Sequence, residues 1–294
     1  MKYREFRLTC DDGRDLDVAS LGNPGGRTLV YHHGSPGSRV HVQSLRALAG
    51  SGDYFVVALS RPGYGESTRL AGRTVSSVVA DVTTALDFFA CDTYVAVGSS
   101  GGAPHALASA ALDAQRCTGA VSIAGVAPTD VDFDWTEGMG PENVEEFALA
   151  KAGGPDYDDH VAQMGALFAG ATPETVVPLF GGLLSDVDRA ALGPLEVRQV
   201  LVDGLRDGLA RGPWGLYDDD RALLSPWGFD TALVPIPVAV VYGDHDLMVP
   251  PTHGRWLAKN VANASVHHFA DEGHLSILEH RVSDLATLLA ELSS

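Results

Sequence analysis

One serine of this chain stands in a setting that suits nucleophilic catalysis. Ser100 lies in the stretch Gly98–Gly102, which reads Gly-Ser-Ser-Gly-Gly and matches G-x-S-x-G. A short apolar run, Tyr94–Val97, leads directly into this motif, and a helical pattern follows it. In such a strand-turn-helix context the serine sits on a sharp turn, and Gly98 and Gly102 let the strand and the helix pass close together. A glycine-rich phosphate loop is disfavoured, because no lysine lies in or beside the motif.

A serine hydroxyl becomes a good nucleophile only when a base accepts its proton and a carboxylate orients that base. His274 follows a β-prone run near the C-terminus, and Asp244 and Asp246 follow the β-prone run before it. The chain order is therefore Ser, Asp, His, with each residue just past the end of a predicted strand. We predict a catalytic triad of Ser100, His274 and one of these two aspartates.

Acyl transfer also needs two backbone donors for the oxyanion. The N–H group of Gly101, directly after the nucleophile, is one candidate. The other is the N–H group of Ser35 in the loop His33–Gly37, because Gly34 allows a turn that no side chain obstructs. An ordinary Gly-Pro turn is the alternative interpretation of this loop.

The elements that must position these residues follow an alternating order. Residues 3–10 and 15–21 are β-prone and flank an Asp-Gly pair, which predicts an antiparallel hairpin. Short apolar runs then alternate with helical patterns, as in parallel βαβ units. The predicted strands are Thr28–His32, Phe55–Ser60, Tyr94–Val97, Gly119–Ile123, Val238–Tyr242 and Val266–Phe269, and the predicted helices lie near residues 40–50, 75–90, 102–114, 252–261 and 276–292. This pattern predicts an α/β fold with a mostly parallel sheet.

Residues 128–230 interrupt this alternation with helical segments broken by Gly and Pro, without a convincing strand. We predict an α/β core domain from residues 1–127 and 231–294, and an inserted helical cap from residues 128–230. The cap holds 20 acidic and 6 basic residues. It could select a cationic substrate, but we favour a solvated surface, with Asp218–Asp220 in a turn. Apolar cap residues suggest a pocket for an uncharged acyl or alcohol group: Phe147, Phe168, Leu179, Phe180, Leu183 and Leu184.

Composition narrows the possible partners. The chain of 294 residues has 38 acidic and 20 basic side chains, hence a formal net charge of −18, which disfavours nucleic acid and anionic membranes as partners. No apolar run approaches the roughly 18 residues of a membrane span. Three scattered cysteines and the absence of an apolar leader indicate a reducing, cytoplasmic setting. We expect a small-molecule substrate and leave the oligomeric state open.

Four motifs in this order resemble the α/β-hydrolase fold superfamily, specifically its cap-bearing serine hydrolase branch with an HGxPG loop. They are His33–Gly37, Arg61–Gly65, Gly98–Gly102 and Gly243–Pro250 followed by Gly273-His274. The resemblance covers the chain from about residue 28 to its end. It implies an eight-stranded, mostly parallel sheet with helices on both faces. Its spacing after Gly243 favours Asp246 as the triad acid.

The resemblance implies a serine hydrolase that cleaves a small carboxylic ester, thioester or lactone through an acyl-enzyme, without a metal or an organic cofactor. Epoxide hydrolases and dehalogenases of this fold place an Asp where this chain has Ser100. The HGxPG loop also resembles that of proline iminopeptidases, but Ser35 and Gly101 stand where that family typically has Gly and Trp. An aminopeptidase or amidase is therefore one alternative. A ligand-binding protein without catalytic activity on the same fold is another.

Overall fold

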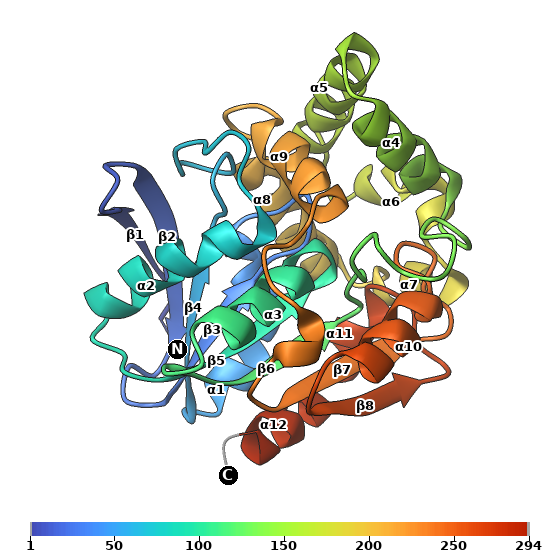
Figure 1. Cartoon of the computed structure of the whole chain (residues 1–294). Coiled ribbons are helices and arrows are strands. Elements are labelled where there is room, and N and C mark those ends of the chain that lie inside the picture. The colour runs from blue at the N-terminus through green and yellow to red at the C-terminus, as the bar shows by residue number, and fades with distance from the viewer. Residues whose placement is uncertain (1, 293–294) are drawn as a thin grey trace.

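The computed structural model describes residues 2–292 and contains one eight-stranded sheet (Figure 1). The strand order is β1-β2-β4-β3-β5-β6-β7-β8. β1 pairs antiparallel with β2 and β2 antiparallel with β4, whereas all later pairs are parallel. The strands are β1 (Arg4–Thr9), β2 (Asp15–Gly22), β3 (Arg27–His32), β4 (Tyr54–Leu59), β5 (Tyr94–Ser99), β6 (Cys117–Ile123), β7 (Val238–Gly243) and β8 (Ala264–Phe269). The predicted hairpin and the mostly parallel eight-stranded sheet are confirmed.

Helices flank the sheet and fill the long connection between β6 and β7. The α-helices are α1 (Arg46–Gly50), α2 (Val78–Phe88), α3 (Ala103–Leu112), α4 (Pro141–Ala152), α5 (Pro155–Ala169), α6 (Val176–Leu179), α7 (Asp186–Ala191), α8 (Leu195–Gly208), α9 (Trp214–Leu224), α10 (Pro251–Asn260), α11 (Ser276–His280) and α12 (Val282–Glu291). Short 3₁₀ turns are η1 (Arg39–Leu45), η2 (Val75–Ser77), η3 (Ser100–Gly102), η4 (Gly181–Leu183) and η5 (Thr231–Leu233).

The prediction of one continuous helix over 276–292 is wrong. The chain breaks at Arg281, whose backbone (φ −109°, ψ 21°) is not helical. The Arg281 side chain instead donates hydrogen bonds to Asp271 and Glu272, in the loop before α11. These hydrogen bonds stabilise the position of Arg281 between the two helices.

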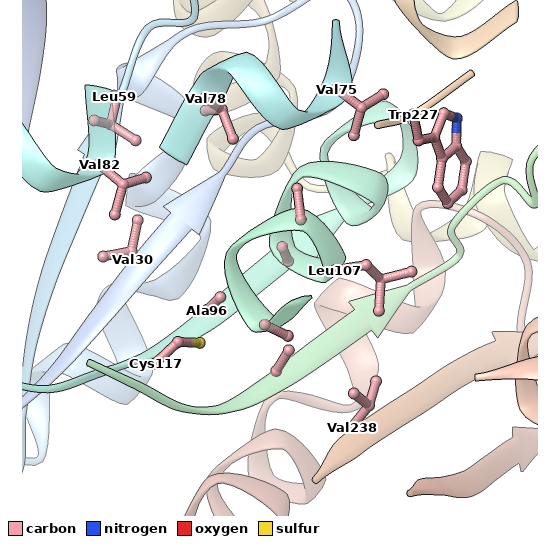
Figure 2. Packing of buried hydrophobic residues seen from close by; sticks show 14 of the residues in the cluster. Val30, Leu59, Val75, Val78, Val82, Ala96, Leu107, Cys117, Trp227 and Val238 are labelled. Atoms are coloured by element: carbon pink, nitrogen blue, oxygen red, sulfur yellow. The ribbon is translucent and has the colours of Figure 1, made fainter. Parts of the chain in front are cut away.

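The parallel strands are buried on both faces. Side chains alternate between the two faces of a strand. Along β3, Leu29 and Tyr31 therefore belong to an apolar cluster on one face of the sheet, and Val30 belongs to a second cluster on the other face. Figure 2 shows part of the second cluster, where Val30 and Leu107 of α3 lie among side chains from α2, β5 and β7. Helices α1 and α12 cover the opposite face. A sheet covered on both sides exposes only its strand ends, and the predicted site residues lie at those ends.

Helices α4–α9 lie between β6 and β7 and gather at the top and right of Figure 1, away from the C-terminus. Residues 128–230, all of which are described, contain no strand. The division into core domain and cap stays a prediction, and residues 1, 293 and 294 of that core domain lie outside the described part of the chain. We use the name cap for residues 128–230 below. Among the described residues, no helix is long and apolar enough to cross a membrane.

Candidate active site

The turn after β5 holds Ser100 in an unusual backbone conformation. Its φ of +53° lies in the left-handed region, which costs a residue other than glycine about 1–3 kcal/mol. A Cβ atom on Gly98 would collide with the carbonyl oxygen of Gly102, and one on Gly102 would collide with the carbonyl oxygen of His32. Only glycines fit at these two positions, so the strand and the helix approach closely and Ser100 projects from the turn between them.

The loops after β7 and β8 bring an aspartate and a histidine together. The Nδ1 atom of His274 lies 2.7 Å from Oδ2 of Asp246, and both side chains are buried. The other oxygen, Oδ1, accepts hydrogen bonds from the backbone N–H groups of Met248 (2.9 Å) and Val249 (2.7 Å). Asp246 is thus fixed by its own loop, and its free lone pairs point at His274.

The neighbours of the imidazole favour its protonated form. Burial by itself lowers the pKa of His274, but the carboxylates of Asp246 and Asp188 outweigh burial and bring the pKa above the ordinary 6.5. Burial raises the pKa of Asp246, and the contact with His274 opposes this rise. The pair can therefore accept a proton on the imidazole and stabilise the resulting charge.

Ser100 and His274 line the same cavity, which has a volume of about 140 Å³. No direct hydrogen bond joins their side chains in this structure, which is common before a substrate binds. More than half of the other lining residues are apolar, and they come from the cap, including Phe180, Leu201 and Leu205, and from the core, which also contributes Glu279. The cavity can therefore hold a small apolar group next to the serine.

The predicted oxyanion residues lie next to each other. A Cβ atom on Gly101 would lie 3.5 Å from the backbone nitrogen of Ser35. A Cβ atom on Gly34 would lie 3.3 Å from Cβ of Ser100, so the loop His33–Gly37 runs along the nucleophile. We call this segment the oxyanion loop. Its approach leaves the backbone N–H groups of Ser35 and Gly101 as candidate oxyanion donors.

A buried network of hydrogen bonds and ion pairs connects the cap to the oxyanion loop. Asp219 of α9 is fully buried and accepts hydrogen bonds from Arg61 (2.6 Å), Arg73 (2.5 Å) and the hydroxyl of Ser35. Arg61 in turn donates to the carbonyl oxygens of His33 and Gly34. Burial alone raises the pKa of Asp219, but the two guanidinium groups outweigh burial and hold the pKa well below its usual range. The Ser35 hydroxyl is engaged in this network, so only its backbone remains for an oxyanion.

A second cavity, of about 150 Å³, also opens onto Ser100 but has a different wall. Four cap carboxylates line it, with His160 and no Lys or Arg among the lining residues: Glu142, Glu145, Glu146 and Asp220. Burial and the nearby charge of Glu146 raise the pKa of Asp220 well above its usual range. Tyr157 donates a hydrogen bond of 2.8 Å to this carboxylate.

The preference for a solvated acidic cap surface is wrong for Asp218–Asp220. Asp218–Asp220 lie in helix α9 rather than in a turn, and all three side chains are buried. They find partners in distant segments: Asp218 bonds Arg69, and Asp219 bonds Arg61 and Arg73. Buried acids need such partners, and local sequence does not reveal them.

Two further groups near the site were missed from sequence. Asp188 of α7 contacts the backbone around His274, and Arg61 holds the oxyanion loop. The only available signal was the Arg61–Gly65 motif of the family resemblance, which assigned the Arg61 side chain no task. Asp244 lies apart from the His274–Asp246 pair, because its carboxylate pairs with Arg255 (3.0 Å) and His268 (2.9 Å).

Comparisons with known proteins agree with the observed fold. A family model described as the alpha/beta hydrolase family matches residues 29–288. Epoxide hydrolase B of Mycobacterium tuberculosis is 36% identical over 121 residues, 40% of this chain and 34% of that protein. Proline iminopeptidase of Xanthomonas citri is 31% identical over 112 residues, 37% of this chain and 36% of that protein. The chain thus matches only about a third of the length of these curated relatives.

An esterase from Exiguobacterium antarcticum has the same fold over nearly the whole length. Its TM-score is 0.68 at 18% identity, and the match covers 99% of this chain and 100% of that chain. The enol-lactonase from Burkholderia xenovorans LB400 gives a TM-score of 0.66 at 19% identity, covering 98% of this chain and 99% of that chain. At these identities the likeness concerns the fold alone.

Proposed function

The chain belongs to the alpha/beta hydrolase family, and from that premise we propose that it is a serine hydrolase cleaving a small carboxylic ester, thioester or lactone. The observation that carries this proposal is the 2.7 Å contact between His274 and Asp246 at a cavity that also contains Ser100. A base oriented by a carboxylate beside a serine on a strained turn is the arrangement that acyl transfer requires.

In the proposed reaction Ser100 Oγ attacks the substrate carbonyl and His274 Nε2 accepts its proton. Asp246 holds the imidazole through Nδ1 and stabilises its positive charge. The backbone N–H groups of Ser35 and Gly101 hold the oxyanion. His274 then returns the proton to the leaving alcohol, thiol or ring oxygen, and a water molecule that it activates releases the acid from Ser100.

The apolar cavity supports an uncharged acyl or alcohol group. Phe180, Leu201 and Leu205 offer apolar surface to a substrate, and Glu279 is the acidic residue among those that line this cavity. Of the six apolar cap residues expected to form the pocket, Phe180 lines both cavities and Phe147, Phe168 and Leu183 line only the second one. Leu179 and Leu184 line neither cavity. The serine at position 100 argues against epoxide opening, for which relatives of this fold use an aspartate.

A second candidate function, an aminopeptidase or amidase with the same reaction steps, is favoured by the carboxylate-lined cavity. Carboxylates without a nearby Lys or Arg attract an ammonium group, and desolvation strengthens this attraction. Glu146 and Asp220 line this cavity together with Ser100, and Oε2 of Glu146 also lies 3.5 Å from Nε2 of His160. Aminoacyl substrates are therefore the natural competitor in any test of the ester proposal.

The test assays two substrate series side by side on the purified enzyme. One series contains neutral short to medium nitrophenyl esters and lactones, and the other contains prolyl and alanyl arylamides with a free amino group. We expect a higher kcat/KM for the neutral series. A clear preference for the arylamides that disappears on N-acetylation would replace the ester proposal by the aminopeptidase.

A pair of variants assigns the result to the second cavity. Glu146→Gln removes one of its charges, whereas Asp159→Asn removes an exposed charge of the same cap outside both cavities. An aminopeptidase would lose arylamide turnover far more in Glu146→Gln than in Asp159→Asn. Equal, small effects of both variants on both substrate series are expected from the ester proposal.

A further inference from the structure

We propose that Asp188 of the cap is a positioning residue that fixes the loop carrying His274, so that the cap helps assemble the catalytic base. This inference rests on the proposed function, because it assigns Asp188 a task in the reaction of Ser100. Asp188 belongs to α7, which packs against α11 directly after His274. The residue is fully buried although it carries a carboxylate.

Three consecutive backbone N–H groups converge on this carboxylate. Oδ2 accepts from the N–H group of His274 (3.2 Å), and Oδ1 accepts from those of Leu275 (2.8 Å) and Ser276 (3.0 Å). The hydroxyl of Ser185 donates to Oδ2 at 2.7 Å and orients Asp188 from its own helix. No Arg or Lys is among these partners, so the backbone of the histidine loop is what stabilises the buried charge.

The contacts lie at the start of α11 and just before it, since Ser276 is the first residue of this helix and His274 and Leu275 precede it. The first N–H groups of a helix lack partners within the helix, and Asp188 satisfies that of Ser276. A Cβ atom on Gly273 would lie 2.5 Å from Oδ2 of Asp188 and 2.6 Å from Oγ of Ser185. A side chain at Gly273 would therefore separate the cap from the loop. The glycine lets the cap carboxylate reach the backbone next to the imidazole.

Asp188 can affect both the position and the protonation of His274. His274 must keep Nδ1 on Asp246 while Nε2 faces Ser100, and a shift of about 1 Å can lower a rate about 10²-fold. Asp188 also adds negative charge close to the imidazole, together with Asp246, and both act against the effect of burial on the pKa of His274. Loss of Asp188 should therefore change the rate and its pH dependence together.

The experiment compares Asp188→Asn with the wild-type enzyme on a neutral nitrophenyl ester. Asparagine keeps one oxygen but turns an NH₂ group towards backbone donors and removes the charge. We expect kcat to fall about 10-fold to 100-fold with little change in KM. Because neutral His274 is required and its pKa is raised, we expect the acidic limb of kcat/KM above pH 6.5 in the wild type, and it should move to lower pH in Asp188→Asn.

Asp218→Asn is the matched control, since Asp218 is also a buried cap aspartate but bonds Arg69 away from the catalytic loops. It should leave kcat and the pH limb unchanged. Ser185→Ala is a milder variant in case Asp188→Asn does not fold, and it should lower kcat a few-fold. An active wild type with unchanged kcat and pH limb in folded Asp188→Asn, or in Ser185→Ala if the former does not fold, would overturn the inference. A wild type inactive on esters would instead overturn the proposed function.

Discussion

The core and the cap bury charged groups in different ways. In the core, the strands from β3 to β7 bury apolar side chains, and the candidate reacting groups Ser100, Asp246 and His274 lie just past strand ends. In the cap, helices carry carboxylate side chains that are fully buried, including those of Asp188 and Asp219. These two carboxylates bond mainly to segments of the core rather than to the cap itself.

The difference indicates a division of labour. The core supplies the groups that we propose to react, and the cap supplies charges that hold the loops carrying them. Asp219 holds the oxyanion loop through Arg61 and Ser35, and Asp188 holds the backbone around His274. Changes at the reacting groups and at Asp188 should therefore act mainly on kcat, whereas breaking the Asp219 network, which pairs two buried guanidinium groups, should act mainly on stability.

The largest of these effects is expected at Asp246. Asp246→Asn should lower kcat about 10⁴-fold, because the amide no longer stabilises the imidazolium and favours the wrong tautomer. Asp244→Asn, two residues away, should retain near-normal turnover, since its carboxylate pairs with Arg255 and His268 instead. Steady-state kinetics on one ester measure both. A reversed order would move the triad acid to Asp244.

The Asp219 network of the cap should respond mainly in stability. Asp219→Asn leaves Arg61 and Arg73 buried without their counter-charge, and we expect the free energy of unfolding to fall by about 3–5 kcal/mol. Asp244→Asn removes an ion pair with exposed partners and should cost less than about 1 kcal/mol. Urea unfolding measures both values. Similar values for the two variants would contradict the division between cap and core.

The sequence predicts the core well because its signals are local. Short apolar runs give the strands within a few residues, and Ser100 and His274 are recognisable because each follows one of these runs, whereas the choice of Asp246 over Asp244 rests on the family spacing after Gly243. The approach of Asp246 to His274 then follows from parallel strands that end at one edge of a sheet.

The cap is less predictable because its interactions are distant in the chain. Asp218–Asp220 look like a solvated turn, since nothing nearby shows that Arg61, Arg69 and Arg73 reach them from about 150 residues away. Asp188 is equally hard to identify from sequence, because its partners are backbone N–H groups that converge on it only in the folded protein. Local pattern therefore places helices in this region without showing which acids they bury.

The measurement that tests the central claim most directly is covalent labelling with a fluorophosphonate, followed by peptide mapping with mass spectrometry. The account predicts a single adduct on Ser100, formed together with loss of ester hydrolysis. Ser100→Ala should take no label and lose about 10⁶-fold in kcat, while its unfolding free energy changes by less than about 1 kcal/mol. Labelling at another residue, or ester hydrolysis by Ser100→Ala at more than a few per cent of the wild-type rate, would contradict it.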